Sequence, residues 1–499
     1  MPDVEVVIAG AGPNGLMLAC ELALAGVRPV VLDRLPGPSA EPKANGLVGQ
    51  VVRQLDMRGL YGRFSGAAAA PEPTDAWIFS GMQVPLAGLA DNPMYAMMIA
   101  QPTLVRLLLE RSAELGVDVR WGHAVEHLAD GPDGVRVALS GPQGGITLDA
   151  RYLVGADGGR STVRKLAGIP FPGHTSDTVS RVAHVAVPDE LRITGGGLEV
   201  PGYGRLPFGH TRLAHGGIIF ADFGHGNPML GTIEFGAGDD VDDTEPLTLP
   251  ELHRSARRVL GVDVPFGPPR GDGPHALRRI AGQNTRQAER YRCGRVLLLG
   301  DAAHVHSAMG GPGLNLGLQD AMNLGWKLAA TVRGGAPPGL LDTYHTERHP
   351  VGRRVMLQSM AQTALFSPGP EIGALRELFD ELLALPEVAR HMAGLLAGSD
   401  VRYDIGDDHP LSGYLVPDMQ LDDGRRVAEL LHSARPLLVG ATVPAAGAVE
   451  VVRAGLRGGP VAMLIRPDGY VAWATDDRSH PGLQAALARW VNKCLVTGR

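Results

Sequence analysis

The chain has 499 residues and a formal net charge of −7, and it contains no block rich in lysine and arginine, which argues against a nucleic-acid-binding face. Its three cysteines are far apart and form no CxxC pair, which argues against a disulfide framework and against a cysteine-based zinc site. No apolar run is long enough to span a membrane and no basic segment precedes the first predicted strand, so we expect a cytoplasmic enzyme without a membrane partner.

The first predicted unit is a strand, a helix and a second strand. Residues 5–9 form a short apolar strand, an apolar helix pattern runs to Gly26, and the strand over 29–32 ends at Asp33. This β-α-β context is what a dinucleotide-binding turn requires, and Asp33 is placed to accept hydrogen bonds from a ribose. The alternative is a glycine turn in an α/β fold that binds no ligand.

The turn inside this unit, GAGPNG, matches the GxGxxG pattern. Gly10 permits the tight turn, Gly12 lets the backbone approach a pyrophosphate, and Gly15 allows the helix to pack closely on the strand. The free N–H groups at the helix N-terminus suit phosphate, although the motif does not separate FAD from NAD. The cofactor-binding residues predicted from this unit are Gly10, Gly12, Pro13, Asn14, Gly15, Asp33 and Arg34.

A second fragment, YLVGADGGRSTVRKLAGI, starts at Tyr152. An apolar strand runs into a turn containing Asp157, and Ser161 and Arg164 follow on a predicted helix. By itself this is also compatible with a strand, a turn and a helix with an ordinary N-cap. Further along, strand-like runs over 182–187 and 217–223, separated by Gly, Pro and Asp turns, indicate an antiparallel sheet.

A third fragment, VLLLGDAAHVHSAMGGPGLNLG, joins an apolar strand to a glycine-rich turn. His304 and His306 are only two positions apart and no acidic or cysteine cluster stands beside them, so we predict no metal site. A second phosphate turn is disfavoured, because the strand ends near Leu299, about ten residues before the glycines.

Three motifs follow one another along the chain: GxGxxG at 10–15, DGxxSxxR at 157–164, and the GD segment that contains Asp301. In this order they resemble the motifs of the class A flavoprotein monooxygenases, which are FAD-dependent aromatic hydroxylases, and the resemblance extends over the whole chain. LLDTYHTERHPVG (340–352) and residues 375–403 resemble the polyketide hydroxylase branch, which includes angucycline and anthracycline hydroxylases and rifamycin monooxygenases. IRPDGYVAW (465–473) resembles the C-terminal thioredoxin-like domain of that branch, which without a CxxC should be redox-inert.

The resemblance implies an α/β fold with a Rossmann-like FAD-binding domain, an inserted antiparallel-sheet substrate domain and a thioredoxin-like C-terminal domain. The FAD-binding domain is expected over 1–72, 100–172 and 275–395, the substrate domain over 73–99 and 173–274, and the C-terminal domain over 396–499. Monomer and homodimer both stay open.

The resemblance also extends the predicted FAD site. Asp301 would meet the ribityl chain, Gln101 would contact FAD, and Lys43 stands where relatives often carry an arginine on the pyrophosphate. Amides at the start of the helix after the GGPG turn are expected to face the pyrimidine edge of the flavin, where reduced flavin carries negative charge. These further predicted cofactor contacts are Lys43, Gln101, Asp157, Gly300, Asp301, Gly313, Leu314 and Asn315.

The implied reaction is hydroxylation of a polycyclic aromatic polyketide through a flavin C4a-hydroperoxide, in antibiotic or other secondary-metabolite biosynthesis, with O2 as co-substrate. NADPH or NADH would bind transiently to reduce FAD. No catalytic base is assigned, since phenols and enols of this kind are already acidic. The flavin-proximal candidates are Ser307, Gly310, Gly311 and Pro312, and the substrate-binding candidates are Trp77, Met82, Tyr95, Met97, Tyr203, His210 and His225. Each substrate candidate can equally be a packing or surface residue.

Two positions depart from the family pattern. Ser307-Ala308 replaces a common proline near the expected C4a edge, and Pro312 makes the turn GGPG where relatives often have GGQG. These departures leave the outcome of the oxygen chemistry open.

Three alternatives to aromatic hydroxylation are therefore kept: Baeyer–Villiger oxygenation of a polyketide ketone, oxidative inactivation of an antibiotic, and a non-catalytic flavin-binding protein. A flavin halogenase is disfavoured because all five tryptophans are isolated and no WxWxIP motif occurs.

Overall fold

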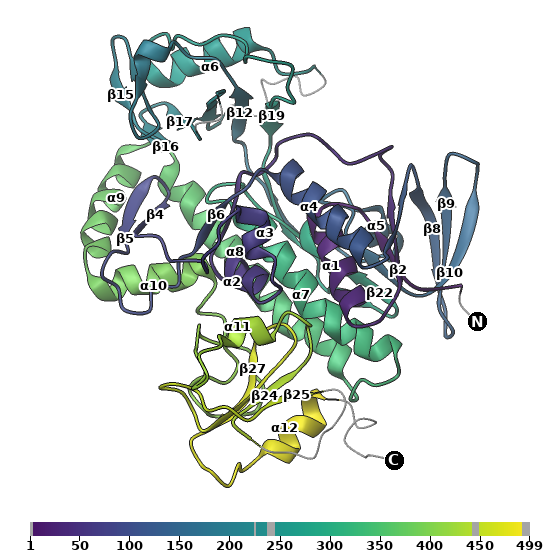
Figure 1. Cartoon of the computed structure of the whole chain (residues 1–499). Coiled ribbons are helices and arrows are strands. Elements are labelled where there is room, and N and C mark those ends of the chain that lie inside the picture. The colour runs from purple at the N-terminus through teal and green to yellow at the C-terminus, as the bar shows by residue number, and fades with distance from the viewer. Residues whose placement is uncertain (1–2, 224–225, 237–244, 442–448, 492–499) are drawn as a thin grey trace.

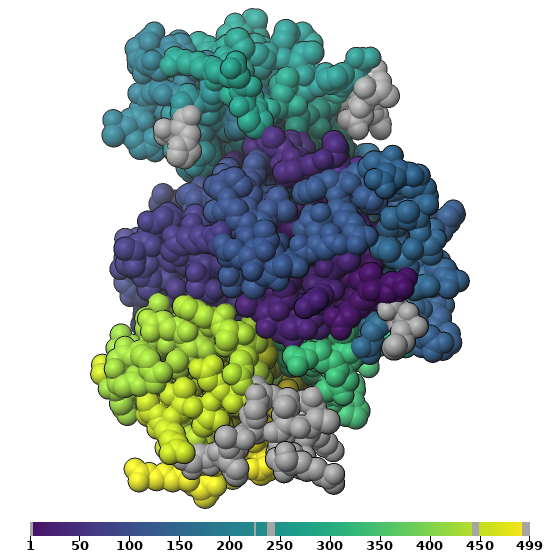
Figure 2. Space-filling view, turned by 45° about the vertical axis from the view of Figure 1, so that its right-hand side comes forward, coloured from purple at the N-terminus to yellow at the C-terminus, as the bar shows by residue number. Residues whose placement is uncertain are grey.

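The computed structural model describes residues 3–223, 226–236, 245–441 and 449–491. The chain forms three tiers, with the antiparallel sheet at one end, the glycine-turn unit in the middle and the C-terminal segment at the other end (Figures 1 and 2). Among the described residues, no helix combines the length and apolarity needed to cross a membrane.

The middle tier is built on a mixed sheet with the order β21-β22-β10-β1-β2-β7. The neighbours from β22 to β7 are parallel, and the longest strand, β10, continues beyond the sheet to pair with β9, which pairs with β8. The strands are β1 (Val4–Ala9), β2 (Pro29–Asp33), β7 (Asp118–Trp121), β8 (Ala124–Asp130), β9 (Val135–Ser140), β10 (Ile146–Gly155), β21 (Arg292–Cys293) and β22 (Val296–Leu298).

The central strands are apolar because helices cover the sheet, as parallel sheets require. In β1, residues Val6 to Ala9 are all buried. Helix α1 (Pro13–Leu24) packs against α4 (Gln101–Glu114) and α7 (Pro312–Val332). Gly325 permits the crossing of α1 and α7, because a Cβ there would collide with the side chain of Glu21. The predicted first β-α-β unit is thus present, in a mixed α/β fold.

The antiparallel tier has the order β16-β17-β18-β12-β19, and α6 (Leu249–Leu260) packs on one face of this sheet. Its strands are β12 (Val179–His184), β16 (Gly209–Leu213), β17 (Gly216–Ala221), β18 (Met229–Glu234) and β19 (Leu277–Ala281). A small sheet lies beside it, formed by β13 (Arg192–Ile193), β14 (Gly197–Val200) and β15 (Gly204–Leu206). The run predicted over 217–223 falls on β17, whereas that over 182–187 only overlaps the end of β12.

Short elements connect the tiers. They are β3 (Gly46–Val48), α2 (Gln50–Asp56), α3 (Tyr61–Ser65), β6 (Ala96–Met98), α5 (Thr162–Leu166), β11 (Gly173–Thr175), η1 (Asp189–Leu191), β20 (Asn284–Gln287), η3 (Gly300–Ala302), β23 (His304–Val305) and η4 (Leu340–Asp342). A helical arm contains α8 (Thr343–Phe366), α9 (Pro370–Leu383) and α10 (Pro386–Ala397), and it packs around the hairpin of β4 (Ala76–Phe79) and β5 (Met82–Pro85) (Figure 1).

The C-terminal tier is a four-stranded sheet with the order β25-β24-β26-β27, in which β24 and β25 are parallel. Its elements are α11 (Val427–Leu430), β24 (Leu437–Val439), β25 (Glu450–Val452), β26 (Ala462–Ile465), β27 (Val471–Thr475) and α12 (Leu483–Trp490). Buried polar contacts attach this tier to the middle one. For example, the Arg58 guanidinium pairs with Glu21 and donates to the carbonyl oxygens of Leu431 and Pro467.

Candidate cofactor and substrate site

The glycines of the GAGPNG turn do two different things. Gly10 has φ +114°, and a Cβ there would overlap the carbonyl oxygen of Ala156. A Cβ on Gly15 would overlap the carbonyl oxygen of Gly10. Around Gly12, in contrast, there is open space, and no side chain caps the N-terminus of α1. The turn therefore leaves open space and an uncapped helix N-terminus beside Gly12, which fits a pyrophosphate.

Asp33 lies at the end of β2, next to this turn. Its Oδ2 accepts a hydrogen bond from the Ala11 N–H at 2.8 Å, and its Oδ1 accepts one from the Leu35 N–H at 2.9 Å. These bonds fix the orientation of the half-buried carboxylate and leave lone pairs on both oxygens for a ribose hydroxyl. The neighbouring Arg34 is exposed, and Lys43 is exposed and paired with Glu41 at 3.3 Å.

The DGxxSxxR fragment forms the N-terminus of α5. Asp157 accepts hydrogen bonds from the Ser161 hydroxyl and from the backbone N–H groups of Thr162 and Val163, so both of its oxygens are used by the helix. Arg164 donates to the carbonyl oxygen of Ala302 at 2.9 Å and lies over the ring of Phe171. The fragment thus braces the GD turn, while the carboxylate of Asp157 acts mainly as a helix cap.

The GD turn, Gly300 and Asp301, is fixed by hydrogen bonds to α7, and its Asp301 side chain stays accessible. Asp320 of α7 accepts from the Gly300 N–H at 3.2 Å, from His304 Nε2 at 2.7 Å and from Arg348 Nε at 2.7 Å. Burial by itself raises the pKa of Asp320, but Arg348 and His304 outweigh it and lower that pKa. The Asp301 side chain, between these fixed points, is exposed.

The position of the Asn14 side chain explains why two residues outside the GxGxxG motif, Gly300 and Gly317, are glycines. Its side-chain amide fills the positions that Cβ atoms on Gly300 and Gly317 would occupy. Its Oδ1 is buried and has no hydrogen-bond partner among the described residues. Asn14 thus links the first turn of α1 to both the GD turn and α7.

The loop before α7 is built from glycines in the left-handed region. Gly310 and Gly311 have φ values of +79° and +67°, and α7 starts at Pro312 with no side-chain cap. The first-turn amides of Gly313 and Leu314 therefore have no helical acceptor, as expected for an anion-facing helix terminus. The Asn315 side chain is engaged elsewhere, since it accepts from the Val48 N–H at 3.0 Å and donates to the Gly311 carbonyl oxygen at 3.1 Å.

Ser307 and Ala308, which the sequence analysis singled out, lie on this loop. The Ser307 side chain is buried, and its hydroxyl oxygen accepts from the Met309 N–H at 3.3 Å, so it braces the turn rather than pointing into solvent. Ala308 is exposed. The nearby His306 ring lies against Gly313, and burial lowers the pKa of that imidazole.

These features together fit a flavin dinucleotide. Two uncapped helix N-termini, at α1 and α7, are accompanied by open space at Gly12 and Gly311 and by the carboxylates of Asp33 and Asp301. Gln101, the first residue of α4, is half-buried and its backbone N–H donates to Ala44.

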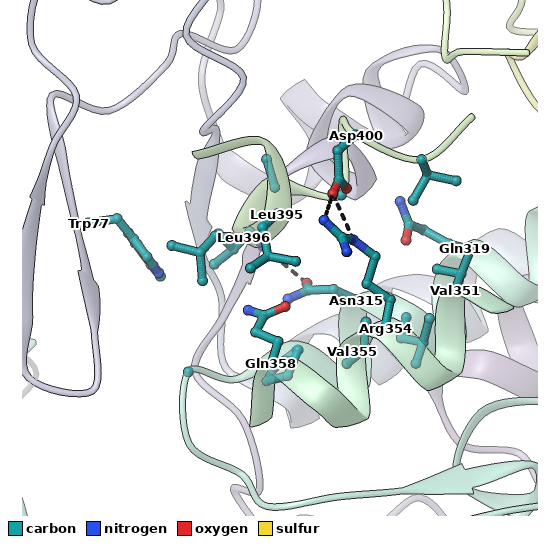
Figure 3. Close-up of a pocket in the computed structure, with 17 residues that line it drawn as sticks. Trp77, Asn315, Gln319, Val351, Arg354, Val355, Gln358, Leu395, Leu396 and Asp400 are labelled. Atoms are coloured by element: carbon teal, nitrogen blue, oxygen red, sulfur yellow. Dashed lines mark hydrogen bonds and ion pairs between the residues drawn. The ribbon is translucent and has the colours of Figure 1, made fainter. Parts of the chain in front are cut away.

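A cavity opens beside the loop (Figure 3). One wall comprises Gly310, Pro312 and Asn315, a second wall is α8, and a third is the end of α10. The apolar lining is Val48, Trp77, Leu316, Val351, Val355, Leu395, Leu396, Ala397 and Val401. A mostly apolar lining with a few polar side chains is typical of small-molecule sites.

The cavity contains a few polar side chains. Arg354 forms an ion pair with Asp400, in which its Nε lies 2.7 Å from Oδ2. Gln358, one turn further along α8, is 4% exposed and makes no hydrogen bond within the described residues. Gln319 of α7 completes the polar lining. The sequence analysis did not predict Arg354, Gln358 or Asp400 as site residues. The only local signal is that Arg354 and Gln358 are four residues apart on one helix. No local pattern places Asp400 beside them.

Of the substrate candidates proposed from sequence, only Trp77 lines this cavity. Met82 and Met97 are buried in hydrophobic clusters, Tyr95 lies near the Arg53 guanidinium, and Tyr203 is exposed. His225 lies outside the described residues.

His210 lies on β16, with its ring 6.0 Å from that of Phe366 at the end of α8. Burial lowers the pKa of His210 to about 4, so its imidazole is neutral at pH 7. In the described part of the chain, no group of three or more His, Cys, Asp and Glu residues could hold a metal ion.

Comparison with known proteins gives a consistent result. Residues 3–359 match the family model described as FAD binding domain, and residues 409–494 match the model described as aromatic-ring hydroxylase, C-terminal. A 12-dehydrotetracycline 5-monooxygenase/anhydrotetracycline 6-monooxygenase from Streptomyces rimosus is 41% identical over 97% of this chain and 98% of its own. A rifampicin monooxygenase from Streptomyces venezuelae is 39% identical over 95% of this chain and 96% of its own. The solved structure of OxyS anhydrotetracycline hydroxylase from Streptomyces rimosus superposes with a TM-score of 0.86 at 39% identity, covering 99% of both chains.

Proposed function

Because the chain belongs to the family of FAD-dependent aromatic-ring monooxygenases, we propose that it hydroxylates a polycyclic aromatic polyketide, with O2 and NAD(P)H as co-substrates. The observation that carries the proposal is the position of the cavity. Most of its lining is apolar, and Gly310 of the glycine loop together with Pro312 and Asn315 of α7, beside the proposed flavin ring, forms one of its walls.

We assign the domains as the sequence predicts them. The FAD-binding domain takes in 1–72, 100–172 and 275–395, the substrate domain 73–99 and 173–274, and the C-terminal domain 396–499. The antiparallel sheet with its own helix α6 and the separate four-stranded C-terminal sheet support this division. The pairing of β3 with β6 joins the first two domains at their border.

FAD, when bound, takes two electrons from NAD(P)H and activates O2 at its C4a atom. The protein would hold the pyrophosphate at Gly12 and the N-terminus of α1, one ribose at Asp33, and the ribityl chain at Asp301. The Gly313 and Leu314 amides would stabilise negative charge on the pyrimidine edge. The Ser307 hydroxyl would support the loop through its hydrogen bond with the Met309 N–H, and the apolar walls of the cavity would pack against the rings of the substrate.

A second function is favoured by one finding. The resemblance to a rifampicin monooxygenase over almost the whole chain supports oxidation of a finished antibiotic, which would inactivate it, by the same chemistry. The two proposed functions differ in the substrate and use the same site.

The test is incubation of the FAD-loaded protein with NADPH, ¹⁸O2 and panels of polycyclic phenols and of rifamycins, followed by mass spectrometry. We expect one ¹⁸O atom in a hydroxylated polycyclic phenol. Incorporation into a rifamycin alone favours the second function, and a product that opens its ring on hydrolysis indicates Baeyer–Villiger oxygenation instead. NADPH oxidation that no aromatic compound stimulates would contradict the proposal.

A further inference from the structure

We propose that Arg354 and Gln358 bind the ionised, oxygenated edge of the substrate, so that the cavity selects polycyclic compounds that carry a phenolate or enolate. This inference rests on the proposed function, because it concerns the substrate of the same site. It adds the charge state of the ligand and the two side chains that recognise it.

The first observation is the composition of the cavity wall. Of the 17 residues that line it, only Arg354 and Asp400 are charged, and the others are apolar residues, glycines and amides. A site made only for a neutral hydrocarbon skeleton would need neither charge. Figure 3 shows both side chains on the wall opposite Trp77, with the aliphatic residues between them.

The second observation is the geometry of the ion pair. The Nε and Nη2 atoms of Arg354 both contact one oxygen of Asp400, Oδ2. Within the described residues, the Nη1 of Arg354 has no acceptor, and the Arg354 side chain is 43% exposed. A guanidinium donates best to an anionic oxygen, and here it has an unused edge for one.

The third observation is Gln358. The residue is only 4% exposed, lines the cavity and makes no hydrogen bond among the described residues, and its amide is open to a ligand or water in the cavity. Gln358 and Arg354 are four residues apart on α8, so they lie on one face of the helix. Together they offer adjacent donors to two oxygens of a planar, oxygenated ring edge.

The opposite charge of Asp400 makes the inference sharply testable. An anionic ligand gains a charge-assisted hydrogen bond from Arg354 but is repelled by Asp400. Removing the two partners of the ion pair should therefore change the affinity for an anion in opposite directions, whereas a purely structural ion pair would weaken binding whichever partner is removed.

The probe is alizarin, a tricyclic diphenol that loses a proton near neutral pH and changes colour when it does. Its dimethyl ether, 1,2-dimethoxyanthraquinone, cannot ionise and is the matched neutral ligand. Dissociation constants for both are measured on the FAD-loaded full chain at pH 7.5, together with the absorption spectrum of bound alizarin. FAD content and the melting temperature of each variant show that it is folded.

We expect Arg354→Met to weaken alizarin binding about 10- to 100-fold, to abolish the spectral signature of the bound anion, and to change binding of the ether little. Asp400→Asn should tighten alizarin binding a few-fold. Gln358→Leu should weaken both ligands about 3- to 10-fold, since an amide also bonds neutral oxygens. Arg353→Met, at the neighbouring exposed arginine outside the cavity, is the control and should change neither.

Equal affinity of the wild-type protein for alizarin and its ether overturns the inference, and so does an Arg354→Met variant that matches Arg353→Met. Either result leaves the proposed function standing if ¹⁸O is still incorporated into a polycyclic phenol. Conversely, opposite effects of Arg354→Met and Asp400→Asn support the assignment of the binding residues even if the reaction catalysed proves to be a different one.

Discussion

Gly10 and Gly12 lie two positions apart in one turn, yet their surroundings differ. A Cβ on Gly10 would overlap backbone, and φ +114° is strained for any other residue. Gly12 has φ −72°, and nothing lies within 4 Å of the Cβ position. The first glycine is therefore required by the fold, and the second by whatever occupies the space beside it.

We predict that Gly10→Ala and Gly12→Ala separate folding from cofactor binding. Gly10→Ala should lower the free energy of unfolding of the apoprotein by about 1–3 kcal/mol or more. Gly12→Ala should leave it unchanged or slightly raise it, because alanine restricts the unfolded chain. It should nevertheless weaken FAD binding by about 10-fold or more, because a methyl group would keep the pyrophosphate from the backbone. Denaturant unfolding of apoprotein and fluorescence titration with FAD measure the two effects. Wild-type FAD affinity in Gly12→Ala would count against the assigned site.

At the scale of elements, α5 has a role that its length of five residues does not suggest. Asp157 and Ser161 cap its N-terminus, and Arg164 extends from it to the carbonyl oxygens of Ala302 and Gly159. Ala302 belongs to η3, which carries Asp301. The second fragment of the sequence thus supports the third, through backbone acceptors that only a planar, multidentate side chain reaches together.

We predict that Arg164→Lys releases FAD about 3- to 10-fold faster than the wild-type protein, because an ammonium group cannot hold both carbonyls and the turn that carries Asp301 loosens. Lys165→Gln changes the exposed neighbour on the same helix and is the control. Stopped-flow recovery of flavin fluorescence on dilution gives the rates. Equal rates for the two variants would show that α5 does not act on the cofactor through Ala302.

At the scale of the whole molecule, a buried charge network joins the C-terminal tier to the helices of the middle tier. Lys327 of α7 and Arg466 of the C-terminal tier both pair with Glu347 of α8, and Arg466 also pairs with Asp468. All four side chains are at most 6% exposed. Burial lowers the pKa of Lys327 to about 8, the direction expected for a desolvated ammonium. Docking of the C-terminal tier therefore depends on keeping every one of these charges paired.

The protonation of Glu347 gives a pH prediction. Burial by itself raises its pKa, but Arg466 and Lys327 outweigh it and hold the pKa at about 2, below the unfolded value of 4.5. Because the folded pKa is depressed, the stabilisation is complete well above pH 4.5 and is lost as the pH falls towards 2. The free energy of unfolding of the wild-type protein, relative to Glu347→Gln, should fall by about 2 kcal/mol between pH 7 and pH 3. Denaturant titrations at several pH values measure the difference.

Glu377→Gln, at an exposed glutamate on α9, is the matched control for this charge removal, and its difference from the wild-type protein should be nearly independent of pH. A flat difference for Glu347→Gln as well would mean that the carboxylate is not held ionised by its two partners.

Sequence by itself determined the features that depend on neighbours along the chain. The GAGPNG turn between β1 and α1, Asp33 at the end of β2, and the glycine turn before α7 follow from local backbone chemistry, because a tight turn and an uncapped helix N-terminus need particular residues at fixed spacing. These features were enough to predict a mixed α/β fold that binds a dinucleotide, and the family resemblance, now confirmed, supplied FAD as the cofactor and the reaction class.

Tertiary structure alone decided which distant residues meet. The cavity brings Val48, Trp77, Asn315, Arg354 and Asp400 together from segments more than 300 residues apart, and no local pattern encodes that meeting. In the same way, tertiary packing buries Met97 in the core and places Asn14 in the space beside Gly300 and Gly317. It also brings Glu347 into an ion pair with Arg466 of the C-terminal tier. The physical reason is that burial and ion pairing depend on the three-dimensional surroundings of a side chain, whereas turns and helix termini are set by the residues next to them.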